Sequence, residues 1–336
     1  MRKEANLEQW KELYEVTIKI KALKPWKYFW DMDIITIILP NLDEPIYCSI
    51  MGRGGEFYGI GTYFGFEAID GFYRISSSDK LPVEQMPRYQ NLLMCTFGSR
   101  DELIKKQLEI IKELGYKFRG KDNWIYFNSH EPGYTPYILD SEEVVLLTEV
   151  FKNLFMAIKA YIENDLKVDF NNGETLLRRY DEKDKLWYNH NAPMLVSQIQ
   201  YPVPVLQDEL LITKLSKEKC NNGKIEIDLL YLNTPINNKS LERPILPRMI
   251  VLSDCLNGSI IDYSILNQED DDAYEIIGCL INYITQLGRP KTIFVRDEYI
   301  QSLLTDLCKK TKLKLEVKNN LDFIDEFIGS FNRFRI

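Results

Sequence analysis

The sequence predicts a two-domain protein, with an α+β N-terminal domain on a mixed or antiparallel sheet and an α/β C-terminal domain. A chain of 336 residues is too long for one ordinary core. Short apolar runs separated by turn residues dominate the first half, whereas the last ninety residues alternate strand and helix patterns. We place the domains at residues 1–165 and 245–336, joined by a strand-containing connector at 166–244.

The N-terminal domain is expected to begin with a helix over residues 7–23, which Pro25 ends. Three strands should follow it, separated by Pro, Asn, Asp and Gly turn signals. An antiparallel meander is the simplest arrangement for them. The three strands are Ile34–Leu39, Ile46–Met51 and Tyr58–Phe64.

Further helices and strands complete this domain. Ser99 and Glu102 form a capping box that opens a helix, and Gly115 ends it. Asp140 caps a long helix that runs to about Ile162. The remaining elements are a short helix at Phe66–Tyr73 and strands at Leu92–Phe97 and Trp124–Asn128.

Turn and charge signals set the domain boundary. Asn171-Asn172-Gly173 and the charged run Asp181–Lys185 favour a linker, so the first domain should end near residue 165. Within the connector, the turn Asn221-Asn222-Gly223 precedes a strand at Ile225–Leu232. The C-terminal domain then follows the order β-β-α-β-α-β. Its elements are Arg248–Leu252, Ser259–Leu266, Ala273–Leu287, Thr292–Val295, Ile300–Lys310 and Leu313–Val317.

Composition argues against several classes of protein. The net charge of −8 opposes non-specific binding of nucleic acids, because such binding depends on neutralising phosphates. No apolar run approaches the roughly 18 residues that span a bilayer, and the first residues lack the apolar core of a signal peptide. We therefore expect a cytoplasmic protein that has no membrane partner.

The cysteines and histidines do not indicate a disulfide framework, a zinc site or a catalytic group. The six cysteines contain no Cys-x-x-Cys pair, which predicts reduced and mostly buried thiols. The two histidines, His130 and His190, neighbour neither a cysteine nor each other, so a structural zinc site is not expected. A histidine-dependent mechanism would have to use one of these two residues.

Four other patterns have structural explanations that we prefer. The glycines between Gly52 and Gly61 lie between two strands, which favours a hairpin over a phosphate loop. The aromatic residues of Trp26–Trp30 favour core packing over a stacking platform for bases or sugars. The acidic run Glu269–Asp272 precedes a helix, and the lysines Lys309, Lys310 and Lys312 end the next helix, so the helix dipole accounts for both.

Asp254 and Asp297 are the candidate catalytic and metal-binding residues. Each follows a short apolar run typical of a buried strand. If the two strands are neighbours, both carboxylates emerge at one edge of the sheet, where open α/β sheets tend to place ligands. Two carboxylates could share Mg²⁺ or Mn²⁺, which prefer oxygen ligands and support phosphoryl displacement when a third ligand is present.

This stretch resembles the ribonuclease H-like fold, especially the integrase and transposase core. The resemblance lies in Asp254, the turn at Gly258, a helix, Gly288-Arg289-Pro290, and a strand that closes on Asp297. It implies an α/β ribonuclease H-like C-terminal domain and a third acidic ligand, for which Asp322, Asp325 and Glu326 are candidates. Residues 245–336 hold 11 basic and 14 acidic residues, so a basic DNA-binding surface is not expected there.

The whole chain is also similar to a bacterial two-domain family of unknown function. The similarity rests on Lys24-Pro25-Trp26, Met51-Gly52-Arg53-Gly54 and Phe118-Arg119-Gly120. It implies an intracellular bacterial protein and does not indicate any particular activity. Our first hypothesis is a non-catalytic binding or scaffold protein with a degenerate ribonuclease H-like domain that has lost, or never had, its metal site. It predicts no particular cofactor and allows an unidentified protein partner. The alternative is a nuclease or phosphodiesterase that uses Mg²⁺ or Mn²⁺ at Asp254 and Asp297.

Overall fold

A computed structural model describes residues 2–77, 81–163, 166–237 and 241–333. The chain forms two compact units. The first contains Met1–Arg74 and Tyr89–Gln198, and the second contains Ile75–Arg88 and Ile199–Ile336. The chain passes from one unit to the other after Arg74, Arg88 and Gln198, and not near residue 165 as predicted.

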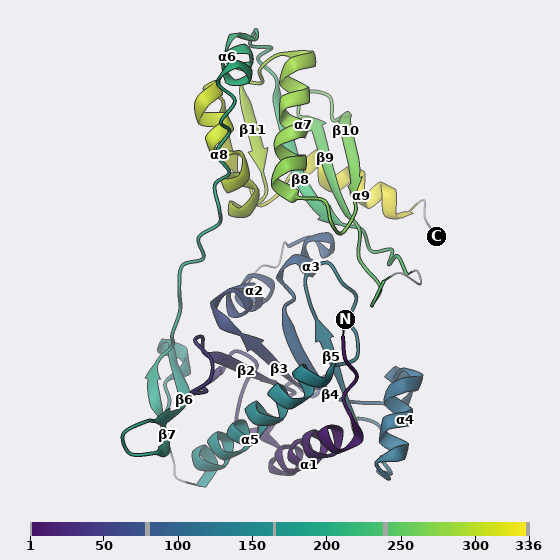
Figure 1. The fold of residues 1–336 in the computed structure, drawn as a ribbon, viewed down its shortest axis with the longest axis vertical. Coiled ribbons are helices and arrows are strands. Elements are labelled where there is room, and N and C mark those ends of the chain that lie inside the picture. Colours follow the sequence, from purple (N-terminus) through teal and green to yellow (C-terminus); the bar gives the residue numbers. More distant parts are fainter. Residues whose placement is uncertain (1, 78–80, 164–165, 238–240, 334–336) are drawn as a thin grey trace. The chain divides into compact units, whose positions relative to one another are not determined.

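The first unit is built on a seven-stranded mixed sheet with the order β5-β4-β3-β2-β1-β6-β7 (Figure 1). The predicted meander of β1, β2 and β3 is confirmed, and all pairs are antiparallel except β1 with β6. The strands are β1 (Ile35–Ile38), β2 (Ile46–Met51), β3 (Tyr58–Phe64), β4 (Leu92–Gly98), β5 (Trp124–His130), β6 (Glu174–Asp181) and β7 (Leu186–Pro193).

The last two strands explain why this unit extends beyond residue 165. Leu176 in β6 pairs with Ile35 in β1 and is fully buried in the main core. Residues 174–193, which the sequence places in a connector, therefore belong to the first sheet. Turn signals such as Asn171-Asn172-Gly173 here separate elements within one unit rather than two domains.

Helices cover both faces of the first sheet. Helices α1 (Leu7–Leu23) and α5 (Ser141–Glu163) lie side by side and share the main apolar core with the strands (Figure 1). Helix α2 (Gly65–Ser77) contributes to a smaller core with Tyr47 and Tyr63. Asp140 caps α5 as predicted, because its Oδ1 accepts from the backbone N–H groups of Glu142 and Glu143.

The predicted helix after Ser99 divides in two. The Ser99–Glu102 capping box opens only a 3₁₀ turn, Arg100–Glu102, and α4 (Lys105–Glu113) begins after an extended Leu103 and Ile104. Gly115 ends this region with a positive φ of 77°, a conformation that glycine adopts without steric cost.

The second unit is built on a five-stranded mixed sheet with the order β10-β9-β8-β11-β12. Strands β10, β9 and β8 are antiparallel neighbours, whereas β8, β11 and β12 are parallel. The predicted order of elements from residue 248 is confirmed, but β8, predicted in the connector, is the central strand. The strands are β8 (Lys224–Tyr231), β9 (Arg248–Asp254), β10 (Ile260–Leu266), β11 (Thr292–Val295) and β12 (Lys314–Val317).

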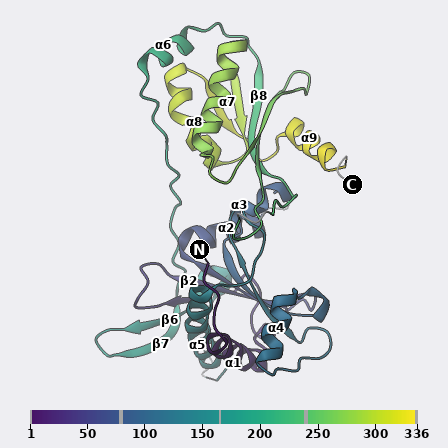
Figure 2. The same cartoon turned by 45° about the vertical axis from the view of Figure 1, so that its right-hand side comes forward.

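The two faces of this sheet carry separate cores, because side chains alternate along β8. Ile225, Ile227 and Leu229 pack with α6 (Glu209–Lys217), α7 (Asp272–Leu287) and α8 (Glu298–Thr311). On the opposite face, Leu230 packs against Ile324 and Ile328 of α9 (Asp322–Arg333). Figure 2 shows α7 and α8 on one side of the strands and α9 on the other.

Several structural explanations from the sequence are confirmed. The glycine patch lies in the β2–β3 hairpin. The acidic run caps α7, where the Asp271 carboxylate accepts from the N–H of Tyr274. All six cysteines are free.

The aromatic cluster is divided, because Phe29 is fully buried whereas Trp30 is 51% exposed and stacks with Arg53. Within the part of the chain that the structure describes, no helix is long and apolar enough to cross a membrane.

Candidate functional site

Asp254 and Asp297 lie at opposite ends of the second sheet. Their strands are not neighbours, because β8 lies between β9 and β11. Asp254 pairs with Ile225 at the start of β8, whereas Asp297 lies two residues beyond Val295, which pairs with Ile227. The two carboxylates are therefore separated by about 10 Å across the strands and a similar distance along them. The shared edge expected from the sequence is not formed, because β9 runs antiparallel to β8 and β11 runs parallel to it.

Each aspartate has a local role in the backbone. Oδ1 of Asp254 accepts from the N–H of Leu256 at 2.8 Å, which stabilises the turn after β9. Oδ1 of Asp297 accepts from the N–H of Ile300 at 2.9 Å and caps α8. Neither interaction brings the two residues toward one ligand.

A cluster of charged side chains lies at the end of the sheet that carries Asp297. Arg296 donates from Nε to Asp228 Oδ2 at 2.7 Å and from Nη2 to Asp325 Oδ1 at 2.5 Å. Arg88 donates from Nη1 to Asp297 Oδ2, also at 2.7 Å. We call these three aspartates and two arginines the carboxylate cluster. Asp228 is completely buried, and Arg296 and Asp297 are 5% and 9% exposed.

Residues 81–88, which we call the strap, cover this end of β8. The strap contains a 3₁₀ turn (Val83–Gln85) and the start of α3 (Met86–Tyr89). Gln85 Nε2 donates to both oxygens of Asp228 at 3.1 Å. Gln85 Nε2 and Arg88 Nη2 also donate to the carbonyl of Leu229, at 3.0 and 2.8 Å.

The strap supplies these hydrogen bonds where the sheet becomes narrower. β8 continues to Tyr231, but its pairing with β11 ends at Ile227. Beyond that point β11 no longer provides partners, and buried backbone groups need partners from elsewhere. The strap is separated from β8 by more than 140 residues of sequence and acts as its substitute neighbour.

Burial and charge oppose each other at Asp228. Burial raises the pKa of Asp228 to about 6, although the guanidinium of Arg296 acts to lower it. Burial also acts to lower the pKa of Arg296, but the carboxylates of Asp228 and Asp325 outweigh this and raise it. At neutral pH both groups are therefore charged, and each neutralises the other.

The carboxylate cluster does not fit a divalent cation. One oxygen of each aspartate already accepts from a guanidinium nitrogen, and these buried positive charges would repel a metal ion. In residues 2–77, 81–163, 166–237 and 241–333, no group of three or more His, Cys, Asp or Glu side chains is arranged to hold a metal.

The candidates for a third acidic ligand lie at different places in the second unit. Asp325 belongs to the carboxylate cluster, although Asp254 does not. Asp322 is the first residue of α9. The carboxylate of Glu226 stabilises the N-terminus of this helix, because its Oε2 accepts from the N–H groups of Phe323 and Ile324 at 3.2 Å.

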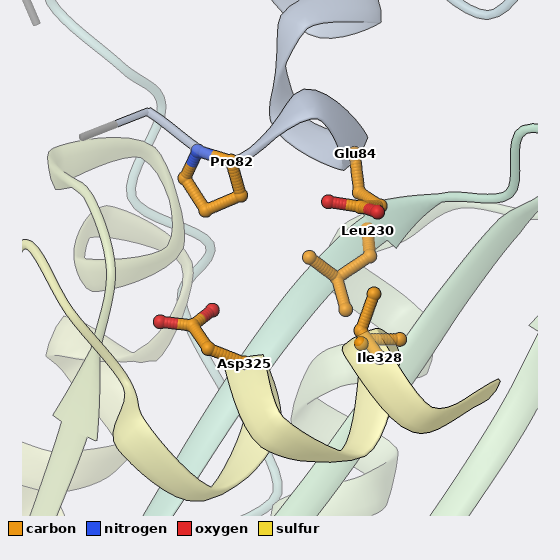
Figure 3. A pocket seen from close by; sticks show the side chains of 6 residues that line it. Pro82, Glu84, Leu230, Asp325 and Ile328 are labelled. Atoms are coloured by element: carbon orange, nitrogen blue, oxygen red, sulfur yellow. The ribbon is translucent and has the colours of Figure 1, made fainter. Parts of the chain in front are cut away.

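A small pocket of 170 Å³ adjoins the cluster. Figure 3 shows Pro82 and Glu84 of the strap on one side and Asp325 and Ile328 of α9 on the other, with Leu230 between them. Pockets for small-molecule ligands generally enclose about 300–1,000 Å³. This pocket is smaller, and we assign it no ligand.

Sequence reasoning missed Asp228, Gln85, Arg88 and Arg296. The signal for Asp228 was present, because Glu226 and Asp228 alternate with apolar residues in a strand-like run. An acid at such a position in a central strand needs a buried partner. The arginines carried no comparable local signal, because their partners lie far away in the sequence.

Comparison with known proteins identifies the family but not an activity. Residues 10–178, half of the chain, match the family model described as "Domain of unknown function (DUF7309)". The chain belongs to the DUF7309 family. Residues 211–332 match a second model, "Domain of unknown function (DUF6930)". The DUF7309 match includes the strap, although the strap packs in the unit that contains the DUF6930 match.

Similar solved structures include the catalytic core domain of HTLV-2 integrase in complex with magnesium, in its trimeric form. It is 16% identical with a TM-score of 0.25, and the match covers 33% of this chain and 68% of that one. The simian T-cell lymphotropic virus intasome in complex with PP2A regulatory subunit B56 gamma is 18% identical with a TM-score of 0.25, covering 36% and 43%. Among curated proteins, none matches this chain. At such TM-scores the likenesses carry no argument about fold or function.

Proposed function

We propose that this protein is a non-catalytic binding protein, and that its second unit is a ribonuclease H-like domain whose acidic end is closed by arginine side chains. The ribonuclease H-like assignment is supported by the order of elements that the sequence resemblance predicts. Asp254, the Gly258 turn, β10, α7, Gly288-Arg289-Pro290, β11 and Asp297 follow one another in that order. As the resemblance implies, we place the protein in the bacterial cytoplasm.

The position of Arg296 carries the non-catalytic part of the proposal. Its guanidinium lies between Asp228 and Asp325, and its side chain is only 3% exposed. A metal-dependent enzyme needs carboxylates that are available to the ion. To free these carboxylates for a metal ion, the guanidinium of Arg296 would have to leave them. Breaking a buried ion pair by removing one partner costs about 3–5 kcal/mol.

The alternative, a metal-dependent nuclease at Asp254 and Asp297, has no geometric support. One cation bound by both residues requires their oxygens within about 5 Å of each other. The intervening strand β8 keeps them much farther apart. We therefore do not propose this activity.

Thermal melting with millimolar MnCl₂ tests the proposal. A ligand that binds only the folded protein raises the melting temperature by linkage. We expect the wild type and the Asp228→Asn variant to respond equally to Mn²⁺, because in this proposal the arginines already occupy the carboxylates of the cluster. The Asp254→Asn and Asp297→Asn variants should also respond like the wild type. A Mn²⁺-dependent rise in the wild type that any of these substitutions abolishes would refute the proposal.

A further inference from the structure

A groove on the first unit has an apolar floor and a basic rim. It encloses 470 Å³ along α4, which lies at the margin of this unit (Figure 1). Ile111 of the floor is 3% exposed, and Leu108, Tyr116 and Trp124 are half-buried against the main core. We call this the α4 groove. Its lining is Arg100, Lys105, Leu108, Glu109, Ile111, Lys112, Gly115, Tyr116, Lys117 and Trp124.

The rim of the α4 groove is positive in a chain whose net charge is −8. Arg100, Lys105, Lys112 and Lys117 are all exposed, and Glu109 is the one acidic residue of the lining. Glu109 lies 3.7 Å from Lys105, an exposed pair of the kind that contributes little. Lys112 and Lys117 form no ion pair within the described ranges. With four basic residues and one acidic residue, the lining of the groove carries a net positive charge.

The spacing of the lining residues indicates the shape of the occupant. Residues 105, 108, 109 and 112 lie on one face of α4 at intervals of three and four, so the groove follows the helix axis for about 10 Å. An elongated, open groove of this length suits a short peptide segment that inserts apolar side chains.

We propose that the α4 groove binds a short acidic, amphipathic segment of a partner protein. Apolar side chains of the segment would pack on Leu108, Ile111 and Trp124, while its carboxylates face the lysines. Nucleic acid fits less well, because it has no aliphatic side chains that could cover Leu108 and Ile111 of the floor. The inference names the partner class for the binding role proposed above. The α4 groove and the carboxylate cluster lie in different units, so the peptide-binding test and the Mn²⁺ test can have independent outcomes.

Fluorescence anisotropy with synthetic probes tests this inference on the full chain. The first probe is a labelled 12-residue peptide with Leu or Phe at positions i, i+3, i+4 and i+7 and Glu elsewhere. Two matched peptides replace every Glu with Lys, or every Leu and Phe with Ser, and a labelled 12-nucleotide single strand is the fourth probe. We expect the acidic amphipathic peptide to bind at least tenfold more tightly than the other three, and more weakly at higher salt.

Charge reversal at the rim locates the binding. The triple variant Lys105→Glu, Lys112→Glu and Lys117→Glu should weaken peptide binding at least tenfold. A control triple variant at exposed lysines of the same unit, Lys19→Glu, Lys27→Glu and Lys183→Glu, changes the net charge equally and should bind like the wild type. Equal weakening in both variants, or preferred binding of the nucleic acid, would overturn the inference.

Hydrogen–deuterium exchange gives a second readout that does not depend on variants. Peptide binding should slow exchange in residues 105–117 of the wild-type protein. Protection elsewhere without protection of α4 would place the binding outside the groove and overturn the inference.

Discussion

The guanidinium of Arg88 lies 2.7 Å from the carboxylate of Asp297, although 209 residues separate them in the sequence. Both side chains are about 10% exposed, and Arg88 also stacks over the ring of Tyr299 at 5.0 Å. Asp297 caps α8 with its other oxygen. One ion pair thus joins the strap to the end of β11 and the start of α8.

Removal of Arg88 should destabilise the second unit. The Arg88→Ala variant leaves Asp297 without its guanidinium and Leu229 without one hydrogen bond, and we expect a loss of about 2–4 kcal/mol. Urea unfolding of the second unit measures this. The control is Lys314→Ala, which breaks the exposed pair between Lys314 and Glu316 of the same unit and should cost less than about 1 kcal/mol. Similar losses in the two variants would show that the buried pair contributes no more than a surface pair.

Asp228 should make the second unit more stable in mild acid. Its pKa in the folded protein, about 6, is above that of an unfolded aspartate, so the folded state binds the proton more tightly. As the pH falls from 7 to 4, the wild type should gain up to about 3 kcal/mol relative to Asp228→Asn. Urea unfolding of both proteins at several pH values gives this difference. A difference that stays constant with pH would contradict the raised pKa.

His130 should have the opposite effect on the first unit. Burial lowers its pKa to about 4, below that of an unfolded histidine, so the unfolded state binds the proton first. Stability from this residue is present above about pH 6.5 and is lost as the pH falls toward 4, by up to about 3 kcal/mol. The His130→Gln variant should show a weaker loss between these pH values in urea unfolding. Parallel profiles for the variant and the wild type would mean that His130 does not titrate abnormally.

Two glycines of the second unit provide a matched pair. Gly288 has a φ of 89°, and a Cβ there would lie 2.4 Å from the carbonyl oxygen of Lys219. Gly288→Ala should therefore cost at least about 2 kcal/mol. Gly278 lies within α7, and a Cβ there would meet no atom within 4 Å, so Gly278→Ala should stabilise by about 0.5–1 kcal/mol. Thermal melting of both variants checks the pair, and equal shifts would contradict the steric argument.

Local signals predicted most helices and strands of this protein. Apolar periodicity, the Asp140 cap and the Gly115 stop depend on neighbouring residues. Helix α5 forms where expected, and Gly115 ends the α4 region, although α4 begins at Lys105 and not after Ser99. The glycine-rich hairpin and the cap of α7 follow from the same short-range physics.

Long-range pairing could not be predicted in this way. Strand β8 looked like part of a connector because its partners, β9 and β11, follow it in the chain, with β11 more than 60 residues away. Placing β8 at the centre moved Asp254 and Asp297 to opposite ends of the sheet. Of the expected site, only Asp297 and Asp325 reach the carboxylate cluster, and the arginines that neutralise it become neighbours only through the fold.

The strap precedes β8 in the sequence, so during synthesis it is made long before the strand that it contacts. Gln85 leaves the ribosome 143 residues before its partner Asp228. At 5–20 residues per second, that delay is about 7–30 s. During this interval β8 has not been synthesised, so Gln85 and Arg88 cannot yet form these hydrogen bonds. The second unit can acquire its final hydrogen bonds only when a segment made early meets a sheet made late.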